Sequence, residues 1–232
     1  MSWLEDAVNA GGFALRKRFL GRILLRRAPQ LNLEIAAASD ECTYYRHVLK
    51  RSGAEAAFGS AEWVIDVGCR NWAYAPVLAQ AFPRAQLIGV ELDGYRRYLN
   101  LERRMDHAEA MAQALRSQWS REARFECADF RAVSLESVRD RPGVICFFYP
   151  FVSARPCLKW GLPSSYSNYV DLLAHAKSAG KRMSLLATHQ GEWERDAADI
   201  AYRKAGFKVQ WIEIPARETQ SFWPSPHTTW AA

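Results

Sequence analysis

The chain of 232 residues has only five cysteines, and no two of them form the C-x-x-C pair of a zinc or redox site. They are scattered and odd in number, at Cys42, Cys69, Cys127, Cys146 and Cys157. This spacing argues against a disulfide framework and against a structural metal. Unpaired cysteines are typical of a reducing compartment, so we expect a cytoplasmic protein with no metal site.

Long apolar segments are scarce as well. No uncharged apolar run approaches the roughly 18–20 residues that a membrane-spanning helix needs. The first residues do not resemble a secretory leader, because Glu5 and Asp6 come early and arginines interrupt the next apolar stretch. With 49% hydrophobic and 24% charged residues, the composition is that of a soluble globular chain that can bury one sizeable core.

The net charge of +6 is unevenly distributed along the chain. Residues 1–30 hold six basic and two acidic side chains, so the remaining 202 residues are only +2. Residues 3–27 have helical periodicity, with Arg18, Arg22 and Arg26 on one face. Two interpretations stay open. In the first, residues 16–27 bind RNA, an anionic lipid surface or a partner. In the second, the helix packs on the domain and its arginine face is solvated.

The order of the expected elements defines the fold class. A second helix is predicted over 40–57, with Ser39 or Asp40 as its N-cap. Strand-length apolar runs follow at 63–67, 87–91, 123–127, 143–148, 183–188 and 207–214, with helical stretches at 73–82, 94–118, 166–179 and 192–205. This alternation predicts an α/β fold with a doubly wound, mostly parallel seven-stranded sheet, its last edge strand at about 227–231. We expect residues 1–59 to be an N-terminal helical extension and residues 60–232 to be the α/β domain.

Polar residues follow the ends of the predicted strands, where open parallel sheets bind their ligands. Glu91, which ends the second strand, suits a ribose, because a carboxylate can accept hydrogen bonds from two vicinal hydroxyls. Asp129, after the third strand, can accept from the exocyclic amine of an adenine, while Phe130 lines the ring. Gly68, after the first strand, lets the backbone approach a ligand closely.

The stretches VIDVGCRN, LIGVELD and RFECADF resemble the successive cofactor-binding motifs of class I S-adenosylmethionine-dependent methyltransferases. The resemblance covers about residues 60–215 and implies a Rossmann-like fold with S-adenosylmethionine as cofactor. The resemblance implies three groups of cofactor-binding residues. Around the methionine moiety lie Asp66, Gly68, Cys69, Arg70 and Asn71; Glu91 binds the ribose; and Leu92, Asp129 and Phe130 contact the adenine. Phe148, at the fourth strand end, is a further candidate.

The first of these motifs departs from its usual pattern. A dinucleotide-binding loop needs G-x-G-x-x-G, whereas Arg70 and Ala73 stand here at the second and third glycine positions. S-adenosylmethionine has no phosphate and places less demand on backbone amides. If residue 70 must take a positive φ, arginine costs about 1 kcal/mol relative to glycine. Trp72, where the family has a small residue, would pack over the cofactor or block it.

The acceptor side is less defined. Amino-group methyltransferases of this class often carry Asn/Asp-Pro-Pro-aromatic at the fourth strand end, and the sequence FYPF here lacks the polar residue. Tyr149 and its aromatic neighbours would line an acceptor pocket or belong to the core. His189, in THQGEWERD, is the candidate general base, because histidine titrates near neutral pH. The long segment after the fourth strand carries Arg155, Lys159 and Trp160, which would select a substrate or dock onto the core.

The function predicted from the sequence is S-adenosylmethionine-dependent methyl transfer by an enzyme with Tyr149 and His189 as catalytic candidates. The first choice of acceptor is a small molecule in a partly aromatic pocket. RNA, bound through residues 16–27 with Arg155 and Lys159, is the second. The alternative is a catalytically degenerate, methyltransferase-like binding module that acts through its basic N-terminal helix.

Overall fold

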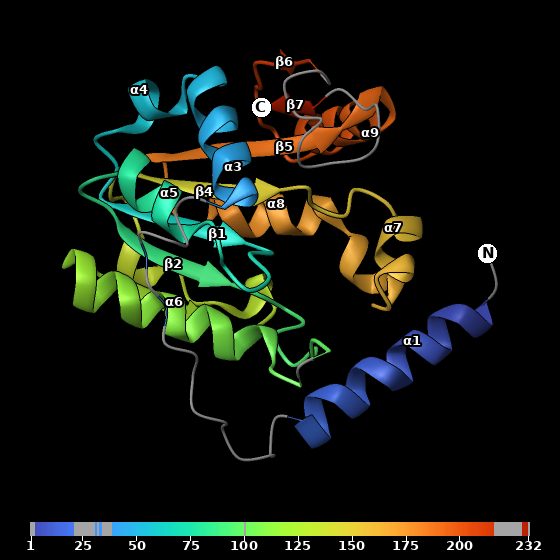
Figure 1. Ribbon diagram of the computed structural model, residues 1–232. Coiled ribbons are helices and arrows are strands. Elements are labelled where there is room, and N and C mark those ends of the chain that lie inside the picture. The colour runs from blue at the N-terminus through green and yellow to red at the C-terminus, as the bar shows by residue number, and fades with distance from the viewer. Residues whose placement is uncertain are drawn as a thin grey trace.

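The computed structural model of the chain describes residues 3–20, 31, 33, 39–99, 101–215 and 229–231. A sheet lies at the centre of the molecule and α1 extends beyond it (Figure 1). The strands are β1 (Trp63–Val67), β2 (Gln86–Val90), β3 (Ala123–Glu126), β4 (Gly143–Phe148), β5 (Met183–Gln190), β6 (Ile212–Ile214) and β7 (Thr229–Ala231). The α-helices are α1 (Trp3–Leu15), α3 (Asp40–Arg51), α4 (Ala54–Phe58), α5 (Ala75–Ala81), α6 (Arg104–Trp119), α7 (Ala154–Lys159), α8 (Tyr169–Lys177) and α9 (Gly191–Lys204). Shorter turns are the π-helical η1 (Arg16–Leu20) and the 3-10 helices η2 (Phe130–Ala132), η3 (Glu136–Val138) and η4 (Ser164–Ser167).

Five parallel strands form the body of the sheet in the order β3-β2-β1-β4-β5. β7 pairs antiparallel with β5, and β6 pairs antiparallel with β7. From β1 the chain adds β2 and then β3 toward one edge of the sheet. It then returns to add β4 and β5 on the opposite side of β1. The strand order therefore reverses between β1 and β4, which is where doubly wound sheets bind ligands. The predicted α/β fold with a mostly parallel sheet is confirmed.

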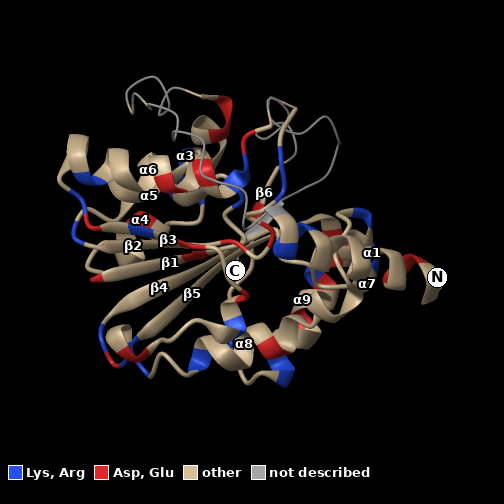
Figure 2. Cartoon of the chain, turned by 90° about the horizontal axis from the view of Figure 1, so that it is seen from below, with Lys and Arg blue, Asp and Glu red and all other residues tan. Residues whose placement is uncertain are grey.

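Both faces of the sheet are covered. Successive strand residues point to opposite faces, and accordingly Val64 belongs to one hydrophobic core and Ile65 to the other. Figure 2 shows α3, α5 and α6 on one side of the strands and α8 on the other. Tyr45 and Val48 of α3 lie in the same core as Val64, so α3 packs directly on the sheet.

Several element boundaries differ from the predictions. The helix expected over 40–57 is divided into α3 and α4, because Gly53 takes a left-handed φ of +70°. Ser39 is the N-cap of α3 and accepts a hydrogen bond from the Cys42 amide. The helix expected over 94–118 begins only at Arg104, where Asp106 binds the Arg103 backbone N–H and caps the first turn.

The strand expected over 207–214 is shorter in the structure, where it covers only 212–214. Residues 21–27 of the expected leader helix, and residues 227–228 of the expected edge strand, lie outside the described residues.

The N-terminal helix α1 packs on the segment that follows β4. Asp6 accepts hydrogen bonds from the backbone and hydroxyl of Ser164, and Asn9 donates to the carbonyl of Leu158. Phe13 is buried in a small cluster with Cys157 and Leu162. Among the described residues, no helix combines the length and apolar character needed to cross a bilayer.

Candidate functional site

A cavity of about 280 Å³ opens at the carboxyl ends of the parallel strands. Its walls come from the ends of β1, β2 and β4, from the turn after β3, and from α7 and its following turns. This is the point at which the strand order reverses, so the cavity lies where the fold favours a ligand. Of the predicted cofactor residues, those that line the cavity are Gly68, Arg70, Glu91, Leu92, Asp129, Phe130 and Phe148.

The loop after β1 has its backbone amides already bonded. The amides of Gly68 and Cys69 both donate to the Val90 carbonyl, at 2.8 and 3.3 Å, and the Arg70 amide donates to Glu91 Oε2 at 2.8 Å. Gly68 has a φ of +78°, and a Cβ at this position would meet no atom within 4 Å. The loop therefore offers open space beside its backbone, and these three N–H groups are not available to bind a phosphate.

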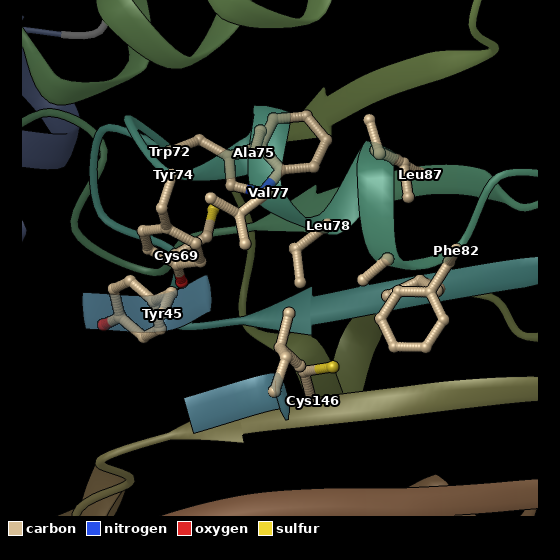
Figure 3. Close-up of a cluster of buried hydrophobic side chains, with 14 of the residues drawn as sticks. Tyr45, Cys69, Trp72, Tyr74, Ala75, Val77, Leu78, Phe82, Leu87 and Cys146 are labelled. Carbon is tan, nitrogen blue, oxygen red and sulfur yellow. The ribbon is translucent and has the colours of Figure 1, made fainter. Parts of the chain in front are cut away.

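The two bulky residues of this loop leave the cavity open in different ways. Arg70 takes a φ of +54°, and its guanidinium turns to α3, where it pairs with Glu41. Trp72 takes a φ of +56° and is fully buried in the core beneath the loop (Figure 3). Its ring packs against Gly89 of β2, where a Cβ would approach the ring to 2.8 Å. Trp72 thus neither covers nor blocks the cavity, and Gly89 provides the space for it.

Asp66 lies below the loop, on the same side as Trp72, and does not line the cavity. The Trp72 indole Nε1 donates to Asp66 Oδ2 at 3.0 Å. Burial raises the pKa of Asp66 to about 7, although hydrogen bonds from Tyr74 and Trp72 lower it. Cys69 is likewise fully buried, and burial raises the pKa of its thiol. Neither side chain, nor that of the half-buried Asn71, is among the cavity-lining residues.

Glu91 directly follows β2 and lines the cavity beside the loop that follows β1. Its two carboxylate oxygens accept the backbone N–H groups of Arg70 and Asp93, each at 2.8 Å, which fixes the orientation of the carboxylate. Arg104 approaches the same carboxylate to 4.0 Å and lies over the ring of Trp160. Burial lowers the pKa of Arg104, against the opposing effect of Glu91, and its Nε has no hydrogen-bond partner within the described part of the chain. Buried carboxylate oxygens and a guanidinium N–H thus converge at one wall of the cavity.

Asp129 and Phe130 occupy the turn after β3. Arg131 binds Asp129 through its backbone amide and through its guanidinium, with the closest contact at 2.7 Å. Burial alone would raise the pKa of Asp129, but the hydrogen bonds from Arg131 hold it below its ordinary value. Phe130 is buried edge-on against Phe147. Three N–H groups of Arg131 donate to a carboxylate that has about four acceptor positions, so Asp129 keeps at most one position for a ligand.

Aromatic side chains make up the remaining wall. Phe148, Tyr149 and Phe151 line the cavity from the end of β4, and Phe148 also belongs to one of the two hydrophobic cores. Tyr149 takes a φ of +56°, and its amide donates to Thr188. Other aromatic residues of the wall come from elements distant in sequence, namely Tyr45, Trp160 and Tyr166.

His189 lies away from the cavity. β5 continues to Gln190, so His189 is a strand residue whose ring is fully buried. Its Nε2 bonds to the Tyr202 hydroxyl at 2.9 Å, and burial lowers its pKa to about 3. A general base must reach the proton that it removes, and His189 does not reach this cavity. Arg155 and Lys159 are exposed and do not line it either.

Four charged residues of the cavity were not identified from the sequence: Asp93, Arg104, Arg131 and Glu194. Arg131 follows Asp129 by two residues, and this spacing is a sequence signal for the local pairing seen in the structure. Arg104 and Glu194 reach the cavity only because of where α6 and α9 pack, and no local pattern marks them. No group of three or more His, Cys, Asp or Glu side chains suited to a metal ion occurs among the residues that the structure describes.

No protein-family model matches the chain, and neither does any curated protein. Solved structures do match. A SAM-dependent methyltransferase from Aquifex aeolicus aligns over 87% of this chain and 96% of its own, with a TM-score of 0.53 and 13% identity. Magnesium protoporphyrin IX methyltransferase from Synechocystis, solved with bound SAM, aligns over 98% of this chain and 93% of its own, with a TM-score of 0.52 and 14% identity. The bifunctional kinase-methyltransferase WbdD aligns over 93% of this chain and 45% of its own, with a TM-score of 0.51 and 12% identity. The chain has the fold of the class I S-adenosylmethionine-dependent methyltransferases.

Proposed function

We propose that the chain binds S-adenosylmethionine in the cavity and transfers its methyl group to an acceptor. The observation that carries this proposal is the loop after β1. Its amides at Gly68, Cys69 and Arg70 are bonded to the end of β2, which disfavours a pyrophosphate, while the space beside Gly68 is open. A dinucleotide is therefore a poor ligand, and a nucleoside without phosphate is a good one. The fold shared with solved methyltransferases supports the same ligand.

The residues present fit the parts of this cofactor. Glu91 would accept hydrogen bonds from the ribose hydroxyls, and the free Nε of Arg104 would donate to one of their oxygens. Leu92, Asp129 and Phe130 would hold the adenine, with Asp129 accepting from its exocyclic amine. The carboxylate of Glu91 is already oriented by the Arg70 and Asp93 amides, and that of Asp129 is oriented by Arg131.

The methionine part would lie along the loop after β1. Gly68 lets it approach the backbone, and Arg70 lines this part of the cavity. Asp66, Cys69 and Asn71 would act here through the shape of the loop, because their side chains do not line the cavity.

When bound, the cofactor supplies an electrophilic methyl group on its sulfonium. Transfer to a good nucleophile depends mainly on alignment, so a dedicated base is not obligatory. The aromatic wall of Tyr45, Phe148, Tyr149 and Phe151 would orient a flat or apolar acceptor and exclude water from it. Tyr149 is the proposed acceptor-contacting residue, and His189 is not part of the proposed site. A small molecule suits this wall better than RNA does, because the exposed Arg155 and Lys159 do not reach it.

A pair of glycine variants tests the cofactor site. Gly68→Ala places a methyl group in the open space of the cavity, whereas Gly53→Ala places one in open space at the start of α4. Both glycines have a positive φ, +78° and +70°, so each variant should lose about 1 kcal/mol of stability from backbone strain. We expect only Gly68→Ala to weaken binding of labelled S-adenosylmethionine, measured by equilibrium dialysis.

Equal binding by wild type and Gly68→Ala would show that no ligand approaches this loop. No binding by a folded wild-type protein would favour the methyltransferase-like binding module instead. If the cofactor binds, methyl transfer from labelled S-adenosylmethionine to candidate acceptors is the next assay, and Tyr149→Ala should lower its rate more than it lowers cofactor affinity.

A further inference from the structure

The N-terminal helix α1 has an apolar face that the rest of the described chain does not cover. It contacts the domain through Asp6, Asn9, Phe13 and Arg16. A different set of apolar side chains is exposed, by 81% for Trp3, 56% for Leu4, 65% for Val8, 57% for Leu15 and 57% for Phe19. Helices that pack on a globular domain normally turn their apolar stripe inward. Here three of the four docking residues are polar, and the stripe faces outward.

Most of these exposed residues share one side of the helix, and Trp3 lies apart from them. Leu4 and Val8 are four residues apart, and Leu15 follows seven residues after Val8, which places all three on one side of the helix. Figure 1 shows α1 extending beyond the α/β body, and the exposed fractions of these side chains leave the stripe accessible to a large flat partner. We call Leu4, Val8, Leu15 and Phe19 the α1 stripe.

Basic residues follow the α1 stripe directly. Lys17 and Arg18 are exposed in η1. In the sequence, residues 17–33 contain five basic residues and no acidic one, and Ile23, Leu24 and Leu25 stand among them. Arg16 is not counted, because it binds Asp93 on the other side of the helix. An apolar helical stripe next to a basic run is the pattern of helices that lie in the interface of a bilayer with anionic lipids.

We propose that α1 docks through the α1 stripe on an anionic lipid surface. The helix can do so without leaving the domain, because the hydrogen bonds of Asp6, Asn9 and Arg16 lie on its other side. Charge complementarity selects the occupant, since the exposed Lys17 and Arg18 attract anionic headgroups while the stripe enters the apolar boundary. RNA is less suited, because phosphates gain nothing from exposed leucine and valine. Moreover, acidic and basic side chains are interspersed over the α/β body (Figure 2).

Docking would bring the cavity near the lipid surface. Arg16 of η1 binds Asp93 at the cavity wall and the Gly161 carbonyl, and Arg96 binds the same Asp93 and the Trp160 carbonyl. The α1 helix is thereby fastened to the segment that lines the cavity with Trp160 and Leu162. The lipid-surface proposal does not require methyl transfer, so it can fail or succeed independently of the proposed function.

Co-sedimentation of the full chain with vesicles tests this proposal. We expect binding to phosphatidylcholine vesicles that contain phosphatidylglycerol and much weaker binding to pure phosphatidylcholine. The double variant Val8→Gln/Leu15→Gln should bind at least about tenfold more weakly, since the apolar anchor is lost. Its matched control is Trp193→Gln/Ile200→Gln, which removes two exposed apolar residues from α9 and should bind as wild type does.

Two double variants that remove positive charge complete the test. Lys17→Gln/Arg18→Gln should weaken binding to the anionic vesicles, whereas Lys204→Gln/Lys208→Gln, at exposed positions distant in sequence, should not. All four variants change exposed residues, so their thermal midpoints should stay near that of wild type.

Absence of vesicle binding by wild type, or equal binding by the stripe variant and its control, would overturn the proposal. A dimer that the stripe variant disrupts, without vesicle binding, would assign the stripe to a second copy. RNA binding that survives in the stripe variant but not in the charge variant, again without vesicle binding, would assign the region to RNA.

Discussion

Replacing the buried Asp66 by asparagine should make the protein more stable at neutral and alkaline pH. Asp66 is fully buried in the core beneath the loop after β1, and the Trp72 Nε1 donates to its Oδ2 at 3.0 Å. Asparagine has nearly the same shape, and its side-chain oxygen can accept the same hydrogen bond. The substitution therefore removes a buried negative charge while the packing stays as it is.

The expected gain follows from the pKa of Asp66. Burial raises this pKa to about 7 in the folded protein, from 3.8 in the unfolded chain. Between these pH values the folded state holds a proton that the unfolded state has released, so the stability of the wild type falls as pH rises through this window. Above pH 7 the loss is complete, and about three pKa units correspond to on the order of 4 kcal/mol. This is the upper bound of the gain from Asp66→Asn at pH 8, and the gain should vanish near pH 4.

Urea denaturation of wild type and Asp66→Asn at several pH values between 4 and 8 measures this difference. The free energies of unfolding should diverge steadily as pH rises. A variant that is less stable than wild type at pH 8, with the same pH dependence, would refute the reasoning, because Asp66 would then be ionised and well solvated in the folded state. Because Asp66 does not line the cavity, we also expect the variant to retain cofactor binding.

Two further substitutions test the packing beneath the site. Gly89→Ala would bring a Cβ to 2.8 Å from the Trp72 ring and should destabilise the protein by about 1–3 kcal/mol through overpacking, seen as a lower denaturation midpoint; an unchanged midpoint would mean that the ring moves freely. His189→Gln should lower stability by about 1–3 kcal/mol, because it disturbs a buried hydrogen bond to Tyr202, yet leave cofactor affinity and methyl-transfer rate unchanged. A loss of rate at full stability would return His189 to the catalytic residues.

The sequence was informative about features that depend on local periodicity. The alternation of apolar runs and helical stretches was sufficient to predict the parallel sheet, and β1 and β4 have the predicted bounds. The strand-end residues Gly68, Glu91 and Asp129 line one cavity because carboxyl ends of parallel strands meet at one edge.

Features that depend on contacts across the fold were not predictable in this way. The direction of Trp72 depends on Gly89, a residue of the adjacent strand, and on a buried acid that binds its indole. The apolar run ends at 188, which predicts that His189 follows the strand, whereas β5 continues to Gln190 and buries the ring. Arg104 reaches the cavity from the first residue of α6, and its place there depends on how that helix packs.

Calorimetric titration of the full chain with S-adenosylhomocysteine and, separately, with NAD⁺ is the most direct test of the central claim. The loop after β1 leaves room for a nucleoside beside Gly68 and keeps its amides bonded to Val90 and Glu91. We predict saturable binding of one S-adenosylhomocysteine per chain and no binding of NAD⁺. Binding of NAD⁺ alone, or of neither ligand by a protein shown to be folded, would contradict the assignment of this cavity to S-adenosylmethionine.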